Sequence, residues 1–127
     1  MIVPVTGVFA AVLGILLLAL SAQVVKFRLK YKKGMGTEAA VRAHGNLVEY
    51  APLGLIMLGI AELNGVASGL VYWTGMTLVV GRLLHAWGMI NGHGEEHKAR
   101  SIGIVLTWLA ILAAAILLLW NVWQVYG

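Results

Sequence analysis

Long apolar runs without charge are the feature that most constrains how this chain can fold. Residues 2–25 contain no charged side chain, and three further apolar stretches follow. A helix needs about 20 mostly apolar residues to cross a membrane, and the first run alone reaches that length. Alternation with a period of two is absent, and the runs are too long for barrel strands. With 61% hydrophobic and 11% charged residues, the sequence predicts an all-α membrane protein rather than a soluble domain.

Glycine-rich turn signals divide the chain into four predicted transmembrane helices, at about residues 2–25, 37–64, 68–90 and 100–124. The second helix opens with polar side chains and becomes apolar only at Tyr50. Its first turns must therefore be covered by protein wherever they lie at membrane depth. We expect one domain, residues 1–127, built as a four-transmembrane-helix bundle.

The positive charges lie on a single side of this arrangement. The nine lysines and arginines are Lys26, Arg28, Lys30, Lys32, Lys33, Arg42, Arg82, Lys98 and Arg100. They occupy the first and third connections or the adjoining helix ends, and an excess of Lys and Arg marks the cytoplasmic side. Both termini are therefore predicted outside and both long connections inside. This placement explains the formal net charge of +4 without a nucleic-acid partner, for which the sequence has no binding motif.

A polar stripe runs along the start of the second predicted helix. Arg42, Asn46 and Glu49 follow one another at spacings of four and three, which puts them on one helical face. Glu38 precedes Arg42 by four residues and extends the stripe, and Tyr50 lies beside it. Ionisable residues inside a membrane helix are costly, so they mark a functional site unless a structural partner explains them.

Polar residues on the other helices face the same end of the molecule. Arg82 and His85 share a face of the third helix, and Arg100 begins the fourth. One interpretation is a pocket whose donors and carboxylates suit a small zwitterionic ligand with more carboxylates than amines. A structural alternative, in which Glu49 pairs with Arg42 or Arg82 and holds helices together, explains the spacing equally well.

The polar stripe also carries a resemblance to a known family. Residues 38–52 read Glu-Ala-Ala-Val-Arg-Ala-His-Gly-Asn-Leu-Val-Glu-Tyr-Ala-Pro. This resembles the signature of the MAPEG family, the membrane-associated proteins in eicosanoid and glutathione metabolism, which is Glu followed by Arg-Ala-x-x-Asn-x-x-Glu-Tyr-x-Pro. The four-helix layout and the Gly-Arg-x-x-His run at residues 81–85 also fit. The resemblance covers nearly the whole chain and is strongest to the short bacterial members, which implies a bacterial inner membrane.

The resemblance implies a homotrimer with three cytosol-facing sites at subunit interfaces, each binding glutathione as co-substrate and none needing a metal. The glutathione-binding positions that it implies are Glu38, Arg42, His44, Asn46, Glu49, Tyr50, Arg82 and His85. An arginine early in the fourth helix stabilises the glutathione thiolate in catalytic members, and Arg100 matches that position. Met89 stands where many members have a tyrosine, so a phenol contact to glutathione is missing or replaced.

The implied function is that of a membrane-bound glutathione transferase, with peroxide reduction as a related reaction. The chain has no cysteine, so any thiol must come from a bound small molecule. A thiol reacts as its thiolate, and a neighbouring guanidinium favours that charged form. Membrane lipids would surround the protein and concentrate a lipophilic electrophile beside the site. The alternative is a non-catalytic member of the family that binds lipid or glutathione.

Two other functions are disfavoured by the sequence. The histidines of the 91–98 loop, His93 and His97, lack the glutamate directly after the first histidine that a zinc-protease helix requires. We therefore interpret them as parts of a solvated loop. A proton-coupled multidrug exporter would need an acidic residue in its first helix, and residues 2–25 contain none.

Overall fold

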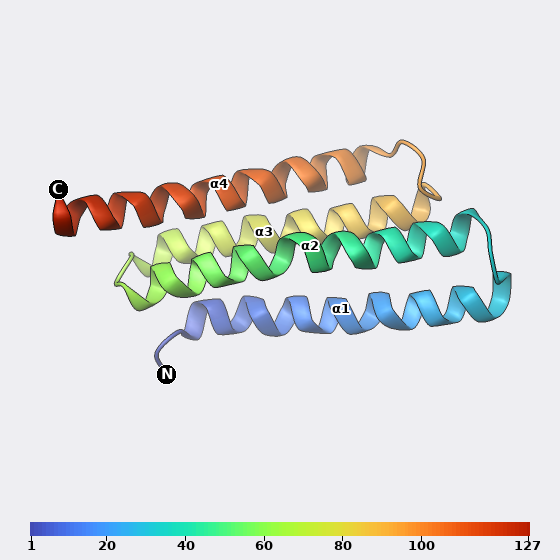
Figure 1. The fold of residues 1–127 in the computed structure, drawn as a ribbon, viewed down its shortest axis with the longest axis horizontal. Helices are drawn as coiled ribbons and strands as arrows, with labels where there is room; N and C mark the ends of the chain where they lie inside the picture. Colours follow the sequence, from blue (N-terminus) through green and yellow to red (C-terminus); the bar gives the residue numbers. More distant parts are fainter.

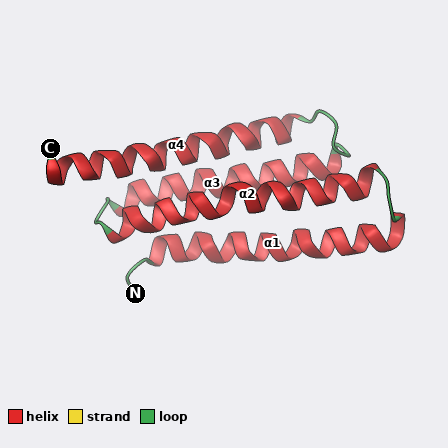
Figure 2. Ribbon diagram, in the orientation of Figure 1, coloured by secondary structure: helices red, strands yellow, loops and turns green.

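The computed structural model describes residues 1–127, apart from the side chain of Met35. It contains four α-helices: α1 (Pro4–Tyr31), α2 (Met35–Leu63), α3 (Ser68–Asn91) and α4 (Lys98–Tyr126). They run up and down alongside one another, with both termini and the α2–α3 turn at one end (Figure 1). The α1–α2 and α3–α4 connections lie at the other end. Figure 2 shows helices joined by short loops, which confirms the all-α prediction.

Three of the helices, α1, α2 and α4, are long and apolar enough to cross a membrane. Their outer faces expose large apolar side chains such as Ile15 and Leu18 on α1 and Leu112 on α4, which is how a lipid-facing surface is built. Helix α3 has 24 residues, about 36 Å at 1.5 Å per residue, but it is not among these three helices. Four spans therefore remain a prediction, with α3 as the untested member.

Helix α3, like α2, packs against all three other helices. Its buried face includes Val71, Leu78 and Arg82, each at most 2% exposed. Across the described part of the chain, α1 and α4 make no close contact with each other, and Figure 1 draws them as the outer pair with α2 and α3 between them. A helix covered on several sides needs less lipid-facing apolar surface, which leaves room for polar groups.

The observed helix ends differ from the predicted ones mainly at the basic end. Helix α1 continues six residues beyond the predicted end at residue 25, with Arg28 and Lys30 in its last turn. Lysine and arginine are good helix formers, and positive charge at a helix C-terminus is favourable. The break falls at Gly34, whose φ of 143° suits glycine. Helix α4 begins two residues earlier than predicted and ends two residues later.

Glycines allow α3 and α4 to approach backbone to backbone. A Cβ at Gly88 would collide with the backbone of Arg100, and a Cβ at Gly103 would collide with the backbone of His85. Gly81 likewise faces the carbonyl oxygen of Gly103. Small residues at helix crossings permit such close packing in membrane proteins. This packing fixes the first turns of α4 against the second half of α3, so that Arg100 lies beside His85.

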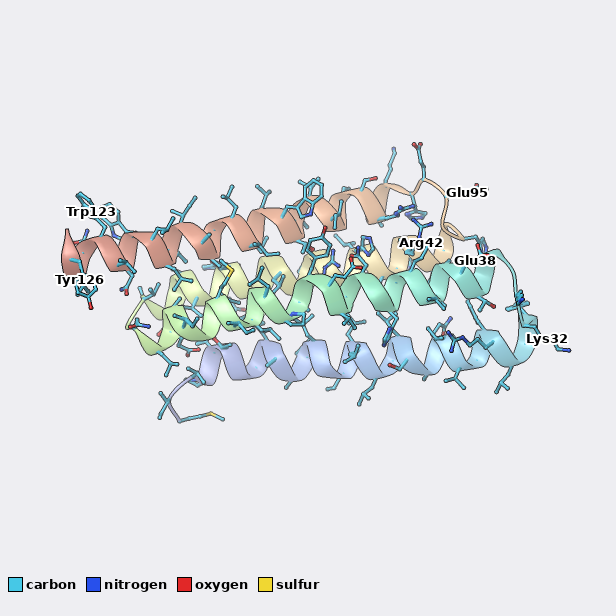
Figure 3. All side chains as sticks on the ribbon, viewed as in Figure 1. Lys32, Glu38, Arg42, Glu95, Trp123 and Tyr126 are labelled. Carbon is cyan, nitrogen blue, oxygen red and sulfur yellow. The ribbon has the colours of Figure 1, made fainter. Side chains whose placement is uncertain are left out.

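A carboxylate near the end of α2 holds the start of α1. Glu62 accepts hydrogen bonds from the backbone N–H groups of Val5, at 2.9 Å, and Thr6, at 2.8 Å. The first N–H groups of a helix have no partner within the helix, and its N-terminus favours negative charge. Glu62 therefore caps α1 across the bundle, close to the exposed Trp123 and Tyr126 end of the molecule that Figure 3 labels.

Candidate functional site

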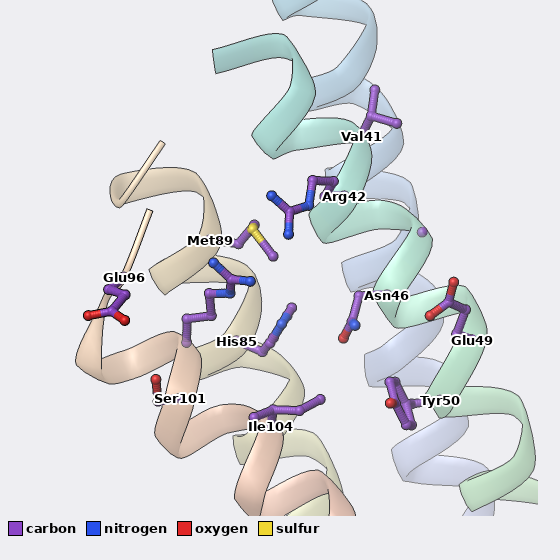
Figure 4. Close-up of a pocket in the computed structure, with 12 residues that line it drawn as sticks. Val41, Arg42, Asn46, Glu49, Tyr50, His85, Met89, Glu96, Ser101 and Ile104 are labelled. Atoms are coloured by element: carbon purple, nitrogen blue, oxygen red, sulfur yellow. The ribbon is translucent and has the colours of Figure 1, made fainter. Parts of the chain in front are cut away.

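A cavity of about 660 Å³ opens between α2, α3 and the start of α4, at the end with the two long connections. This volume lies in the range usual for small-molecule sites, about 300–1,000 Å³. Six of the predicted site residues line it: Arg42, Asn46, Glu49, Tyr50, His85 and Arg100 (Figure 4). The structure thus brings together the polar stripe of α2 and polar residues of two other helices.

The periodicity of α2 explains why its polar stripe reaches the cavity. Ala39, Ala43 and Leu47 are buried at 1–3% exposure and form the packed side of this helix segment. Arg42, Asn46 and Glu49 are one or two residues away from these positions, and all line the cavity. The Nη1 atom of Arg42 reaches the α3–α4 loop, where it would lie 3.5 Å from a Cβ at Gly94.

Arg100 lines the same cavity and also binds the loop that precedes it. Its Nη1 donates hydrogen bonds to the carbonyl oxygens of Gly94, at 2.9 Å, and Glu95, at 3.4 Å. One side of the guanidinium therefore holds the α3–α4 loop in place. The Arg100 side chain is half-buried within the cavity wall.

Arg82 lies behind the cavity wall rather than in it. Its side chain is only 2% exposed, and its Nε donates to Thr107 Oγ1 at 2.7 Å. Its Nη1 donates to the Oδ1 of Asn46 and, at 3.4 Å, to the backbone carbonyl of Asn46. The guanidinium carbon lies 5.3 Å from the centre of the Tyr50 ring. Within the described chain, its Nη2 atom has no hydrogen-bond partner.

This network decides how Asn46 faces the cavity. An asparagine amide has one oxygen that accepts and one nitrogen that donates. Because Oδ1 is engaged by Arg82, the Nδ2 group is the one left to donate into the cavity. One structural alternative was a pair between Glu49 and Arg82. In the structure the hydrogen bonds of Arg82 go to Asn46 and Thr107 and not to Glu49. Glu49 itself is exposed.

Two predicted site residues lie away from this cavity within one chain. His44 faces α1, where it lines a smaller hollow with Ser21, Val24 and Arg28. Glu38 lines a groove at the α1–α2 connection. The helical turn explains both positions, since His44 is two residues, or about 200°, from Arg42, and Glu38 lies one turn nearer the end of the bundle. The structure therefore separates them from the six residues that converge.

The sequence did not identify every residue around the cavity. Glu96, Ser101 and Ile104 also line it, although residues 91–98 were interpreted as a solvated loop. Their contribution depends on how the loop folds back between α3 and α4, for which the sequence carries no local signal beyond the neighbouring Arg100. Met89, noted for replacing a tyrosine, is 3% exposed and also reaches the cavity wall.

The loop histidines have a structural use in one case. His97 is the N-cap of α4, and its Nδ1 accepts a hydrogen bond from the backbone N–H of Ala99 at 3.2 Å. Its ring lies edge-on to Trp87, with centroids 5.1 Å apart. Among the described residues, no group of three or more His, Asp or Glu side chains is arranged to hold a metal ion.

Comparison with known proteins agrees with the signature on α2. The model of the MAPEG family matches residues 6–120. Inner membrane protein YecN of Escherichia coli K12 is 32% identical over 122 residues, covering 91% of both chains. YecN of Escherichia coli strain CFT073 shows the same identity and coverage. Together with the apolar helices, these matches show that the chain is a membrane protein that belongs to the MAPEG family.

Proposed function

We propose that this protein is a membrane-bound glutathione transferase, which joins the glutathione thiolate to lipophilic electrophiles. The observation that carries the proposal is a polar cavity within a membrane bundle, backed by the buried cation Arg82. Ionisable groups are expensive inside a membrane and persist where they serve a ligand or pathway.

The charges around the cavity match those of glutathione. Arg42, Arg100 and the underlying Arg82 outnumber Glu49 and Glu96 by one positive charge, with histidine counted as neutral. Glutathione has two carboxylates and one ammonium group, so it is a monoanion while its thiol is protonated. A buried charge without a counter-ion is destabilising, and an anionic ligand would relieve that cost. Glu49 and Glu96 offer acceptors for the ammonium group.

Arg100 is the proposed catalytic residue. With glutathione bound, its guanidinium favours loss of the thiol proton to solvent water, because nearby positive charge stabilises the thiolate. The sulfur then attacks an electrophilic carbon. With an aryl halide, a carbon–sulfur bond forms, and halide leaves with the electron pair of the broken bond. The hydrogen bonds from Arg100 to Gly94 and Glu95 hold its position during this step.

The same proposal gives His44 and Glu38 a place. Both lie on parts of α2 that face away from the cavity of their own chain. In a homotrimer with sites at subunit interfaces, these residues of one subunit would serve the cavity of a neighbour. Native mass spectrometry in detergent tests the trimer, and a clean monomer or dimer would contradict it.

We also propose that the cavity faces the cytoplasm of a bacterial cell, with both termini outside. Its support is the concentration of all nine Lys and Arg residues towards this end and the inner-membrane location named for YecN. Reporter fusions should place Gly94 in the cytoplasm and Gly65 outside. An external Gly94 would overturn this orientation.

A non-catalytic binding protein is the second candidate function. Two observations favour it: Met89 occupies a wall position where many family members have a phenol, and Arg100 already uses Nη1 to hold the loop. On this interpretation glutathione or a lipid binds and no thiolate forms. The two functions therefore differ in turnover and in thiolate formation.

The test begins with calorimetric titration of glutathione into the purified protein, followed by turnover of a generic aryl halide. We expect binding and conjugation in the parent and loss of binding in Asn46→Ala. This variant removes the Nδ2 donor and also the Oδ1 acceptor of the buried Arg82, so binding is compared only in folded trimeric protein. Ser101→Ala is a matched control, because it alters an exposed cavity residue outside the Arg82 network. Unchanged glutathione affinity in folded Asn46→Ala would show that Asn46 is not a ligand.

A further inference from the structure

The α3–α4 loop brings a carboxylate into the wall of the cavity. Glu96 lines the cavity together with Arg100 and Ser101, whereas the side chain of the preceding Glu95 is not part of the lining. Figure 4 shows Glu96 and Ser101 on one side of the cavity and Glu49 on the opposite side. Of the two acceptors proposed for the ammonium group of glutathione, Glu96 is therefore the one that shares a wall with the proposed catalytic arginine.

Backbone hydrogen bonds fix the loop that carries Glu96. The N–H groups of residues 93–95 donate to carbonyl oxygens within residues 89–92, at 2.9–3.2 Å. Gly94 adopts a φ of 83°, which favours glycine, and Arg100 binds two carbonyl oxygens of the same loop. The backbone of Glu96 is thus held at the cavity both by the residues just before it and by the first turn of α4.

Arg100 does not use this carboxylate as its partner. The hydrogen bonds of its guanidinium go to the carbonyl oxygens of Gly94 and Glu95, and neither goes to Glu96. Carbonyl groups carry no net charge, so they leave the positive charge of Arg100 uncompensated. The same wall of the cavity therefore presents a cation and an anion to whatever binds there.

The charge balance of the cavity shows how Glu96 would act on a bound thiol. The ionisable groups that face the site are Arg42, Glu49 and Tyr50 on α2, Arg82 and His85 on α3, Glu96 on the loop and Arg100 on α4. Their net charge of about +1 at neutral pH matches glutathione with a protonated thiol, which is a monoanion. The thiolate form is a dianion and exceeds that match by one negative charge, so a carboxylate in the Arg100 wall opposes it.

We propose that Glu96 sets the charge state of the bound ligand, by opposing Arg100 and limiting the share of glutathione that is bound as thiolate. Thiolates with a lower pKa are weaker nucleophiles, with a Brønsted slope of about 0.4–0.5. Glu96 therefore lowers the amount of thiolate and raises the reactivity of the thiolate that forms. This inference rests on the proposed transferase function, for which it names a residue that tunes the reacting sulfur.

The first test measures binding of two glutathione analogues by calorimetric titration. Glutathione sulfonate carries a permanent negative charge at the position of the thiol, and ophthalmate has a methyl group there. We expect Glu96→Gln to raise the affinity for the sulfonate relative to ophthalmate by about three- to tenfold. Glu95→Gln is the matched control, because it removes the neighbouring charge outside the lining and keeps the carbonyl that Arg100 contacts. It should change this ratio by less than about twofold.

The second test is the pH profile of aryl halide conjugation at saturating glutathione. Glu96→Gln should lower the apparent pKa of turnover by about 0.5 to 1 unit. Below that pKa the variant should be about two- to threefold faster than the parent, and on the alkaline plateau about twofold slower. Two profiles that cross in this way are not produced by a change in stability. Glu96→Asp keeps the charge, so its profile and its affinity ratio should follow the parent.

The outcomes separate this inference from the proposed function. Glu96 directly precedes His97, the N-cap of α4, so its charge could instead only stabilise the helix N-terminus. In that case Glu96→Gln would lower the apparent Tm and leave the affinity ratio unchanged, which would overturn the inference and leave the transferase proposal in place. An equal change in Glu95→Gln would also overturn it, in favour of diffuse surface charge. A parent protein that binds neither glutathione nor the two analogues would overturn both proposals.

Discussion

The two ends of the bundle satisfy their polar side chains to different degrees. At the end with the chain termini, Glu62 is matched within the chain, because the N–H groups of Val5 and Thr6 donate to its two oxygens. At the other end, Arg82 is 2% exposed and its Nη2 lacks a partner within the described residues. Glu62 completes the fold, whereas Arg82 leaves a charge for something else to complete. A polar residue in a membrane helix indicates a binding site only where the chain itself does not satisfy it.

The largest effect is expected from Arg100→Leu at the end with the cavity, which we call the open end because Arg82 Nη2 has no partner there within the described residues. If Arg100 stabilises the thiolate, its loss raises the pKa of the bound thiol by about one to three units. Conjugation of a generic aryl halide near neutral pH should then fall by about 10- to 30-fold, because a thiol at its ordinary pKa near 8.5 still holds about 3% thiolate at pH 7, while glutathione still binds. The ultraviolet absorbance of the bound thiolate should fade in parallel.

The matched control for Arg100→Leu is Lys98→Leu, which removes a cation from the same first turn of α4 outside the cavity lining. Its turnover and thiolate absorbance should remain near those of the parent. If trimeric Arg100→Leu protein forms thiolate as readily as the parent, Arg100 serves only to hold the loop at Gly94 and Glu95.

The next largest effect is expected when the open end is closed by mutation. Asn46→Asp would give Arg82 a carboxylate partner in place of the amide oxygen that it now contacts. The new charge should repel an anionic ligand and weaken glutathione binding by about tenfold. The same change should raise the apparent Tm, because the buried guanidinium gains a counter-ion.

Opposite changes in stability and binding are the signature of this interpretation of Arg82. Asn91→Asp is the control, since Asn91 is exposed and its Nδ2 donates only to the carbonyl of Trp87 at 2.8 Å. That control should neither raise the apparent Tm nor weaken glutathione binding. An Asn46→Asp protein that is less stable than the parent would show that Arg82 has no need of a counter-ion.

At the end with the chain termini, which we call the closed end, Glu62→Gln should lower stability and leave the glutathione site intact. Loss of the carboxylate weakens the cap of α1 and removes the negative charge at its N-terminus, which should cost about 1 kcal/mol. Thermal unfolding in detergent should show a lower apparent Tm, with glutathione affinity unchanged. Glu95→Gln, at an exposed loop position, is the control for charge removal. A loss of glutathione affinity in Glu62→Gln would show that the two ends are coupled.

The contrast between the ends also explains what could be predicted from the sequence. The helices and the stripe of Arg42, Asn46 and Glu49 follow from periodicity within one segment, so they were predictable. The cap joins Glu62 to Val5 and Thr6, which precede it by 57 and 56 positions, and no local pattern connects the two segments. The bond between Arg82 and Asn46 spans 36 positions, so the sequence could group Arg82 with the predicted site residues but could not place it behind Asn46.

The smallest effect is expected from Met89→Tyr in the cavity wall. Met89 is 3% exposed and reaches the same cavity as His85 and Arg100, so a phenol there would place a hydroxyl donor near a bound thiolate. A larger side chain in a packed site costs about 1–3 kcal/mol of stability, but the open cavity beside Met89 gives the ring somewhere to go. Conjugation should therefore stay equal to the parent or rise by less than about tenfold. Met89→Phe adds the ring without the hydroxyl, so it separates the effect of size from that of the donor. Equal turnover in the two variants would show that the hydroxyl does not reach the thiolate. Lower turnover in both would show that the cavity wall at Met89 does not accommodate the added ring.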